Sequence, residues 1–129
     1  MADWVIVVDD DISNLKMAGH ILSKANMRVT ALKSGQSFLE YVRTKGYPDL
    51  VLLDVKMPVM DGFETMESFL RLDGGSNVPV AFLTADENEE SQKRGHSLGA
   101  VDFIKKPFVP DDLISRVRRM IDENHQKKL

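Results

Sequence analysis

Short apolar runs alternate five times with segments of helical periodicity along this chain of 129 residues. The runs typical of buried strands cover residues 4–8, 27–32, 50–53, 78–83 and 101–104. Apolar spacing and breaking residues predict helices over residues 12–26, between Ser34 and Gly46, between Gly62 and Gly74, and over 86–98 and 111–123. Strands separated by helices of this length are typical of a parallel sheet with right-handed crossovers. The sequence therefore predicts one doubly wound α/β domain with helices on both faces of the sheet.

The bulk composition narrows the class of protein. A chain of this length supplies one hydrophobic core rather than two. Its net charge of −3, from 17 basic and 20 acidic residues, argues against direct contact with nucleic acid, which requires a basic patch. Cysteine is absent, which excludes disulfides and thiolate chemistry. The first apolar run has five residues, too few for a signal-peptide core or a membrane span, so we expect a cytoplasmic protein without direct membrane contact.

Polar residues with distinct chemistry follow four of the five apolar runs. In chain order they are Asp9-Asp10-Asp11, Asp54, Thr84 and Lys105-Lys106-Pro107. Because the carboxyl ends of parallel strands share one edge of the sheet, we expect these groups to meet there. Clustered carboxylates raise one another's pKa and offer the oxygen ligands that Mg²⁺ prefers. A carboxylate nucleophile, a metal ion, a hydroxyl and an ammonium group together favour phosphoryl transfer, which depends on positioning and charge stabilisation.

Four motifs in a fixed order give the chain a specific resemblance. They are Val7-Val8-Asp9-Asp10, Leu53-Asp54-Val55-Lys56-Met57-Pro58-Val59-Met60-Asp61-Gly62, Leu83-Thr84-Ala85 and Lys106-Pro107-Phe108. With this set the chain resembles, over essentially its whole length, the receiver domain of two-component response regulators, of the kind seen in the chemotaxis receiver. The resemblance implies a flavodoxin-like, five-stranded parallel sheet in the order 2-1-3-4-5 with five helices. It implies a receiver domain over residues 1–124, with 125–129 as a C-terminal tail or the start of a linker.

The resemblance also implies a role for each residue at this edge. Asp54 would be the phosphoacceptor, taking its phosphoryl group from a phosphohistidine. Mg²⁺, or Mn²⁺ in its place, would be held by Asp10 directly, by Asp9 through water, by Asp54 and by the backbone carbonyl of Lys56. Thr84 would donate a hydrogen bond to a phosphoryl oxygen and shift toward it as part of the switch. Lys106, beside a cis bond to Pro107, would pair with Asp54 and then with the phosphoryl group.

Three further positions are expected to modulate the response. Phe103 stands where the family keeps a switch aromatic residue, commonly Tyr, and without the hydroxyl its inward burial should cost less. Lys56 and Asp86 stand two residues after Asp54 and Thr84, where family members tune the hydrolysis of the acyl phosphate. A lysine and an aspartate across the mouth of the site would hinder the approach of water and slow hydrolysis.

The implied partners are a sensor histidine kinase or a histidine phosphotransfer protein, and a downstream protein target or a fused output domain. The output would pass through the surface formed by helix 86–98, strand 101–104 and helix 111–123, with a phosphorylation-dependent dimer as a further option. Between Asp86 and Ser97 there is no large apolar residue, and Gly95 lies inside this helix. We therefore expect helix 86–98 to be the least stable of the five.

Simpler interpretations remain open for single residues and for the whole chain. Asp11 is better explained as the N-cap of the first helix than as a ligand. Thr84 and Glu87 fit a capping box, which is compatible with a phosphoryl contact. Asp9-x-Asp11, Thr84 and Lys106 loosely match a haloacid-dehalogenase-like phosphatase, but the later acidic motif and the cap of that class are missing. A receiver that serves only as a constitutive interaction module is a third alternative, which nothing in the acceptor site favours.

Overall fold

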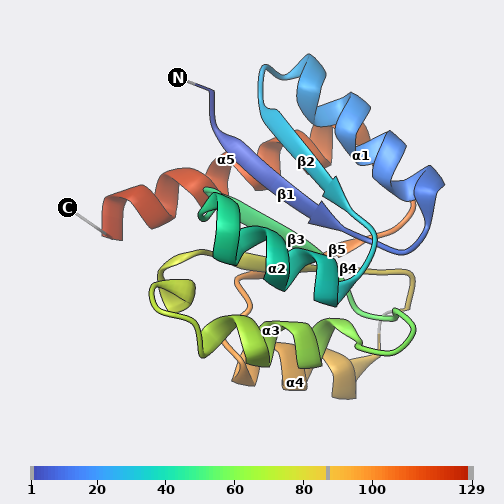
Figure 1. Ribbon diagram of the computed structural model, residues 1–129. Helices are drawn as coiled ribbons and strands as arrows, with labels where there is room; N and C mark the ends of the chain where they lie inside the picture. Colours follow the sequence, from blue (N-terminus) through green and yellow to red (C-terminus); the bar gives the residue numbers. More distant parts are fainter. Residues whose placement is uncertain (1, 87, 128–129) are drawn as a thin grey trace.

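The computed structural model describes residues 2–86 and 88–127 and contains one five-stranded parallel sheet in the order β2-β1-β3-β4-β5. The strands are β1 (Trp4–Val8), β2 (Arg28–Leu32), β3 (Leu50–Asp54), β4 (Val80–Thr84) and β5 (Asp102–Lys105). The α-helices are α1 (Ile12–Lys24), α2 (Gly35–Lys45), α3 (Gly62–Leu70), α4 (Glu89–Ser97) and α5 (Pro110–Lys127), and a 3₁₀ turn, η1, covers Gly75–Asn77. Figure 1 shows α1 and α5 on one face of the sheet and α2, α3 and α4 on the other. The predicted fold class and strand order are confirmed.

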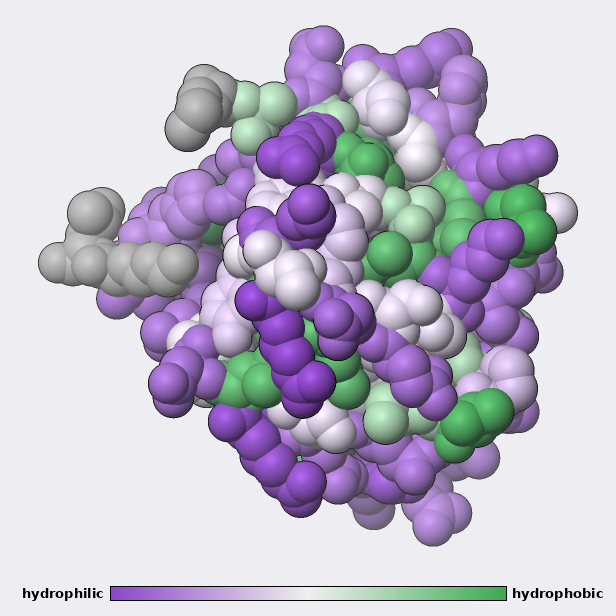
Figure 2. Space-filling model, in the orientation of Figure 1, coloured by the Kyte–Doolittle hydropathy of each residue, from purple (hydrophilic) through white to green (hydrophobic). Residues whose placement is uncertain are grey.

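The core consists of two apolar layers, one on each face of the sheet. Val5 and Val7 of β1 pack with residues of α1 and α5, whereas Ile6 and Val8 pack with residues of α2 and α3. Because β1, β3 and β4 are covered on both faces, their sequences are apolar instead of alternating, up to the terminal Asp54 of β3 and Thr84 of β4. On the outside, Figure 2 shows a face covered mainly by hydrophilic side chains, with apolar ones in small separate patches.

Several element ends differ from the prediction by a few residues. Helix α1 ends at Lys24 because Asn26 takes a positive φ of 66° and the N–H of Met27 donates to the carbonyl of Leu22, which closes the helix in a Schellman motif. Strand β4 begins at Val80, directly after a proline that has no N–H for the ladder. Helix α5 continues through Lys127, and the Asn124 amide in its last turns donates to the carbonyl of Asn77 at 3.2 Å.

Helix α4 begins later than predicted and has little apolar surface. Its N-cap is Asn88, whose side chain accepts hydrogen bonds from the N–H groups of Glu90 and Ser91. The predicted capping box between Thr84 and Glu87 lies partly outside the described residues, since Glu87 is not described. The one buried residue of α4 is Gly95.

Gly95 is the residue that lets α4 lie close to the sheet. A Cβ atom at this position would lie 2.3 Å from Cζ of Phe103 and 3.1 Å from Cδ2 of Phe82. Phe103 fills this space and makes an edge contact with His96, at 5.2 Å between ring centroids. The glycine therefore weakens the helix, by about 1 kcal/mol relative to alanine, but is required by the packing.

We predict that the backbone amides of α4 exchange with solvent much faster than those of α1. Helix α4 buries one glycine, whereas α1 buries Leu15, Ala18, Ile21 and Leu22, so local opening of α4 exposes far less apolar surface. Hydrogen exchange followed by NMR or mass spectrometry measures the difference directly. Equal protection of the two helices would contradict the prediction.

Candidate functional site

The strand register brings the predicted residues together at the carboxyl edge of the sheet. Val8 of β1 pairs with Leu53 of β3, so the next residues, Asp9 and Asp54, emerge side by side. Asp54 in turn pairs with Leu83 of β4, and Thr84 pairs with Lys105 of β5. Lys106 follows at once, with a cis peptide bond to Pro107. The predicted convergence at this edge is confirmed, and it follows directly from parallel pairing.

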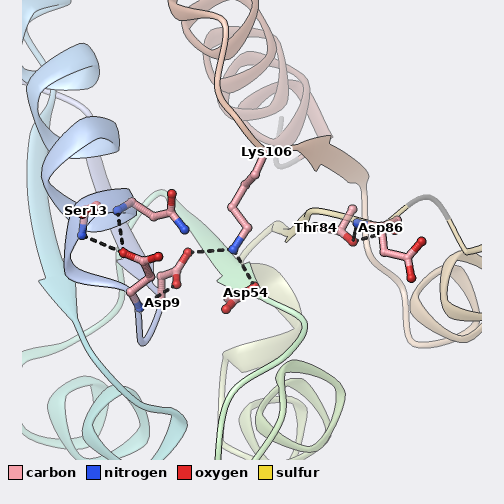
Figure 3. Close-up of polar contacts among 8 residues, drawn as sticks. Asp9, Ser13, Asp54, Thr84, Asp86 and Lys106 are labelled. Carbon is pink, nitrogen blue, oxygen red and sulfur yellow. Dashed lines mark hydrogen bonds and ion pairs between the residues drawn. The ribbon is translucent and has the colours of Figure 1, made fainter.

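Lys106 joins two buried carboxylates. Its Nζ atom lies 3.0 Å from Oδ1 of Asp54 and 3.2 Å from Oδ2 of Asp9, as Figure 3 shows. Asp9 is fully buried and Asp54 is 4% exposed. Two carboxylates at this depth repel each other and lose hydration, so the ammonium group supplies the charge that compensates them.

These surroundings raise the pKa values of both Asp54 and Lys106. The pKa of Asp54 is raised from 3.8 to about 6, mainly by burial and then by the charge of Asp9, against the opposing effect of Lys106. Burial favours a lower pKa for Lys106, but its hydrogen bond and charge pairing with Asp54, together with Asp9, outweigh this and raise that pKa. At neutral pH Asp54 is thus an ionised carboxylate that is more basic than an exposed one.

Thr84 is turned toward its own loop. Its hydroxyl donates a hydrogen bond to the backbone carbonyl of Asp86 at 2.7 Å and accepts one from the backbone N–H of Asp86 at 3.0 Å. Figure 3 shows the Thr84 side chain directed at Asp86 and not at Asp54. A contact between this hydroxyl and a group on Asp54 therefore requires the bond to the Asp86 carbonyl to break.

A pocket of about 240 Å³ opens above these residues. Its lining includes every predicted acidic, hydroxyl and lysine site residue, and the full set is Asp9, Asp10, Asp11, Asn14, Asp54, Val55, Lys56, Thr84, Ala85, Asp86 and Lys106. Carboxylate oxygens of Asp9, Asp10 and Asp54 lie within 4.8 Å of one another. Three hard oxygen donors beside an open pocket fit a divalent cation such as Mg²⁺, which keeps several waters of its own.

The remaining predicted residues are arranged around this centre. Asp11 caps α1, with Oδ1 accepting from the N–H of Ser13 at 2.8 Å, as its N-cap interpretation predicts. Lys56 and Asp86 are exposed on two different loops of the pocket rim, and within the described part of the chain they do not form an ion pair with each other. Phe103 is not part of the pocket lining and packs on α4 instead.

Asn14 is a pocket residue that the sequence reasoning missed. It lies in the first turn of α1 and lines the pocket from that side. Its position in the first helical turn after Asp9-Asp10-Asp11 is a signal that could have indicated it, because that turn begins at the same edge of the sheet.

A parallel 2-1-3-4-5 sheet with an acidic triad and a lysine at its carboxyl edge defines the receiver class of signalling switch. The sequence pattern of the response regulator receiver domain matches residues 5–118, so the chain belongs to the receiver family of two-component signalling. Chemotaxis protein CheY4 of Vibrio cholerae is similar in structure, with a TM-score of 0.86 and 31% identity over 93% of this chain and 99% of that one. The chain is accordingly a signalling switch domain and not an enzyme that turns over an external substrate.

Longer proteins also contain this domain. The DNA-binding response regulator MtrA of Mycobacterium tuberculosis is 37% identical over 124 residues, which are 96% of this chain and 53% of that protein. A probable cyclic di-GMP phosphodiesterase of Vibrio cholerae is 35% identical over 97% of this chain and 28% of its own length. The chain thus spans about half or less of the curated relatives it matches. Within its described residues, no helix combines the length and apolarity needed to cross a bilayer.

Proposed function

We propose that this receiver accepts a phosphoryl group on Asp54 from a histidine kinase or a histidine phosphotransfer protein. The observation that carries the proposal is the position of Asp54, which is buried at the end of β3 and hydrogen-bonded to Lys106 at 3.0 Å. Asp54 also lines the pocket, where carboxylate oxygens of Asp9 and Asp10 lie within 4.8 Å of its own. An oxygen of the Asp54 carboxylate attacks the phosphorus atom, and the bond from phosphorus to the histidine nitrogen breaks as the new bond forms. Lys106 keeps Asp54 ionised before transfer and then faces the phosphoryl oxygens.

The metal site belongs to the same proposal. Asp10 would bind Mg²⁺ or Mn²⁺ directly, Asp9 through water, and Asp54 and the backbone carbonyl of Lys56 would complete the protein ligands. The close spacing of the three carboxylates supports this assignment. A bound divalent ion neutralises charge that gathers on the transferring phosphoryl oxygens.

We propose that Thr84 and Phe103 transmit the phosphorylation of Asp54 to the output surface formed by α4, β5 and α5. The Thr84 hydroxyl would leave the Asp86 carbonyl and donate to a phosphoryl oxygen, which moves the loop leading into α4. Phe103 lies against Gly95 of that helix, so a shift of α4 changes the space available to its ring. On the output surface, Arg116 of α5 holds Asp102 of β5 through an ion pair of 2.8 Å, which couples the strand and the helix.

The receiver family and its longer members indicate which partners this chain would have. The phosphoryl donor would be a histidine-containing protein. The receiver would act on a protein target or an output domain through the surface formed by α4, β5 and α5, either as a monomer or as a phosphorylation-dependent dimer. Residues 125–129 would then be a tail or the start of a linker after a domain that ends near residue 124. We place the protein in the cytoplasm, without direct contact to nucleic acid or membrane.

Intact-mass analysis after incubation with Mg²⁺ and acetyl phosphate tests the proposal. The parent protein should gain one phosphoryl group, an Asp54→Asn variant should gain none, and a chelator should abolish the gain. A folded parent that gains nothing, even from a histidine phosphotransfer protein, would favour the interaction-module alternative. Asp11 would be the second acidic residue of a haloacid-dehalogenase-like phosphatase. Because its side chain is engaged as the α1 cap, this contact argues against the phosphatase alternative.

We predict that the double variant Lys56→Ala, Asp86→Ala loses its phosphoryl group about fivefold faster, which corresponds to a barrier lower by about 1 kcal/mol. Both side chains stand at the rim of the pocket, where they restrict the approach of water in line with the acyl phosphate bond. The measurement is the half-life of the phosphorylated protein. A double variant of the exposed residues Lys33 and Glu40, outside the pocket, is the control, and equal half-lives for all three proteins would refute the prediction.

A further inference from the structure

The first residue of α3 lies directly against the backbone of Asp54. A Cβ atom on Gly62 would lie 2.2 Å from the carbonyl oxygen of Asp54 and 3.0 Å from Cα of Val55. The N–H of Gly62 also donates to the carbonyl of Val55 at 2.8 Å. These neighbours are backbone atoms, which cannot rotate aside as a side chain can. Any side chain at residue 62 must therefore move either α3 or the strand end that carries Asp54.

A strained turn brings the chain back to this contact. The N–H of Met60 donates to the carbonyl of Pro58 at 2.8 Å, which closes a three-residue turn around Val59. Val59 has a φ of 69°, a conformation that is an outlier for a β-branched residue, and its side chain is 91% exposed and gains nothing from burial. Backbone strain of this kind is retained where the surrounding structure enforces it, often beside a functional site.

The first turn of α3 is a fixed element. Asp61 and Glu64 form a reciprocal capping box, with hydrogen bonds of 2.8 and 3.0 Å. The buried hydroxyl of Thr65 donates to the carbonyl of Asp61 at 2.7 Å. Phe63 and Met66 anchor the same turn in the core. The end of the helix that contacts Asp54 is thus fixed by three kinds of contact: the capping box, the Thr65 hydrogen bond and the packing of apolar side chains in the core.

We propose that Gly62 and the capped first turn of α3 form a positioning element for the phosphoacceptor. The contact fixes the position of the Asp54 backbone at the carboxyl edge of the sheet. It thereby fixes the Asp54 carboxylate relative to Asp9, and the Lys56 carbonyl two residues further along. Gly62 is a positioning residue in this proposal, since it acts only through Asp54 and its neighbours. The inference rests on the proposed function, because it assigns Asp54 and the Lys56 carbonyl to the metal and phosphoryl site.

A matched pair of glycine variants tests the positioning role. Gly75 is also the first residue of a helical turn, and its Cβ would lie 2.1 Å from the carbonyl oxygen of Phe69, far from the pocket. Gly62→Ala and Gly75→Ala therefore introduce the same kind of backbone clash in two places. Both should lower the urea midpoint of unfolding. Only Gly62→Ala should weaken Mg²⁺ binding, by about tenfold in a calorimetric or NMR titration, and slow the labelling of Asp54 by acetyl phosphate.

Equal Mg²⁺ affinities for the two folded glycine variants would overturn the inference. If Gly62→Ala does not fold, Asp61→Ala loosens the same turn by removing its cap, and Ser34→Ala removes the N-cap of α2 as the control. Weaker Mg²⁺ binding in Asp61→Ala alone supports the inference, and equal binding in both cap variants overturns it. Failure of the parent protein to label at Asp54 contradicts the proposed function instead, while the Mg²⁺ comparison still decides the positioning role.

Discussion

Replacing Lys106 by methionine should lower the free energy of unfolding of the metal-free protein by about 3 kcal/mol at pH 7. Methionine keeps an unbranched apolar side chain but removes the ammonium group that lies 3.0 Å from Asp54 and 3.2 Å from Asp9. Both carboxylates are buried, so the loss leaves two negative charges without a compensating cation. The protein can respond by protonating Asp54, and its pKa should therefore rise above the value of about 6 that Lys106 helps to maintain.

Urea unfolding and an NMR titration of the Asp54 carboxyl group measure these two effects. Lys33→Met is the control, since Lys33 is an exposed lysine outside the pocket lining. Saturating Mg²⁺ should restore part of the lost stability, because a ligand that binds only the folded state stabilises it. An unchanged unfolding free energy for Lys106→Met would mean that the two carboxylates do not depend on the ammonium group.

The position of the site could be predicted because it depends on local sequence and a general rule. Each apolar run identifies a strand, and parallel strands present their carboxyl ends at one edge, so Asp9, Asp54 and Thr84 had to emerge together. The pairing of Lys106 with Asp54 was also expected. Its second bond, to Asp9, was not, since it depends on side-chain depth that no sequence pattern gives.

Other features depend on contacts between segments far apart in the chain. In the sequence, Gly95 only indicates a helix of low stability. The structure gives the reason for a glycine, because Phe103 packs where a Cβ atom would lie. The sequence predicts a contact of Thr84 with the phosphoryl group after transfer, but it does not give the partner of the hydroxyl before transfer, which is the backbone of Asp86. Both cases concern a choice between alternative side-chain positions, which the residue type alone does not determine.

In the absence of metal, Asp54→Asn should be more stable than the parent protein at pH 7, by roughly 3 kcal/mol, and about equally stable near pH 4. The pKa of Asp54 is about 6 in the folded protein and 3.8 is its ordinary value. The folded state therefore binds this proton more tightly than the unfolded state, so the parent loses stability as the pH rises from about 4 to 6 and levels off above that range. Asparagine cannot ionise and removes this loss.

The difference between the two proteins isolates this single group, because every other carboxylate is present in both. Urea unfolding in EDTA at a series of pH values gives the difference curve, and parallel stability curves would show that Asp54 is not the source of the pH dependence. Repeating the series with Mg²⁺ adds a second test. The ion should stabilise the parent at neutral pH by replacing the proton as the compensating charge. It should stabilise Asp54→Asn much less, because that variant lacks one of the three carboxylates proposed to hold the ion.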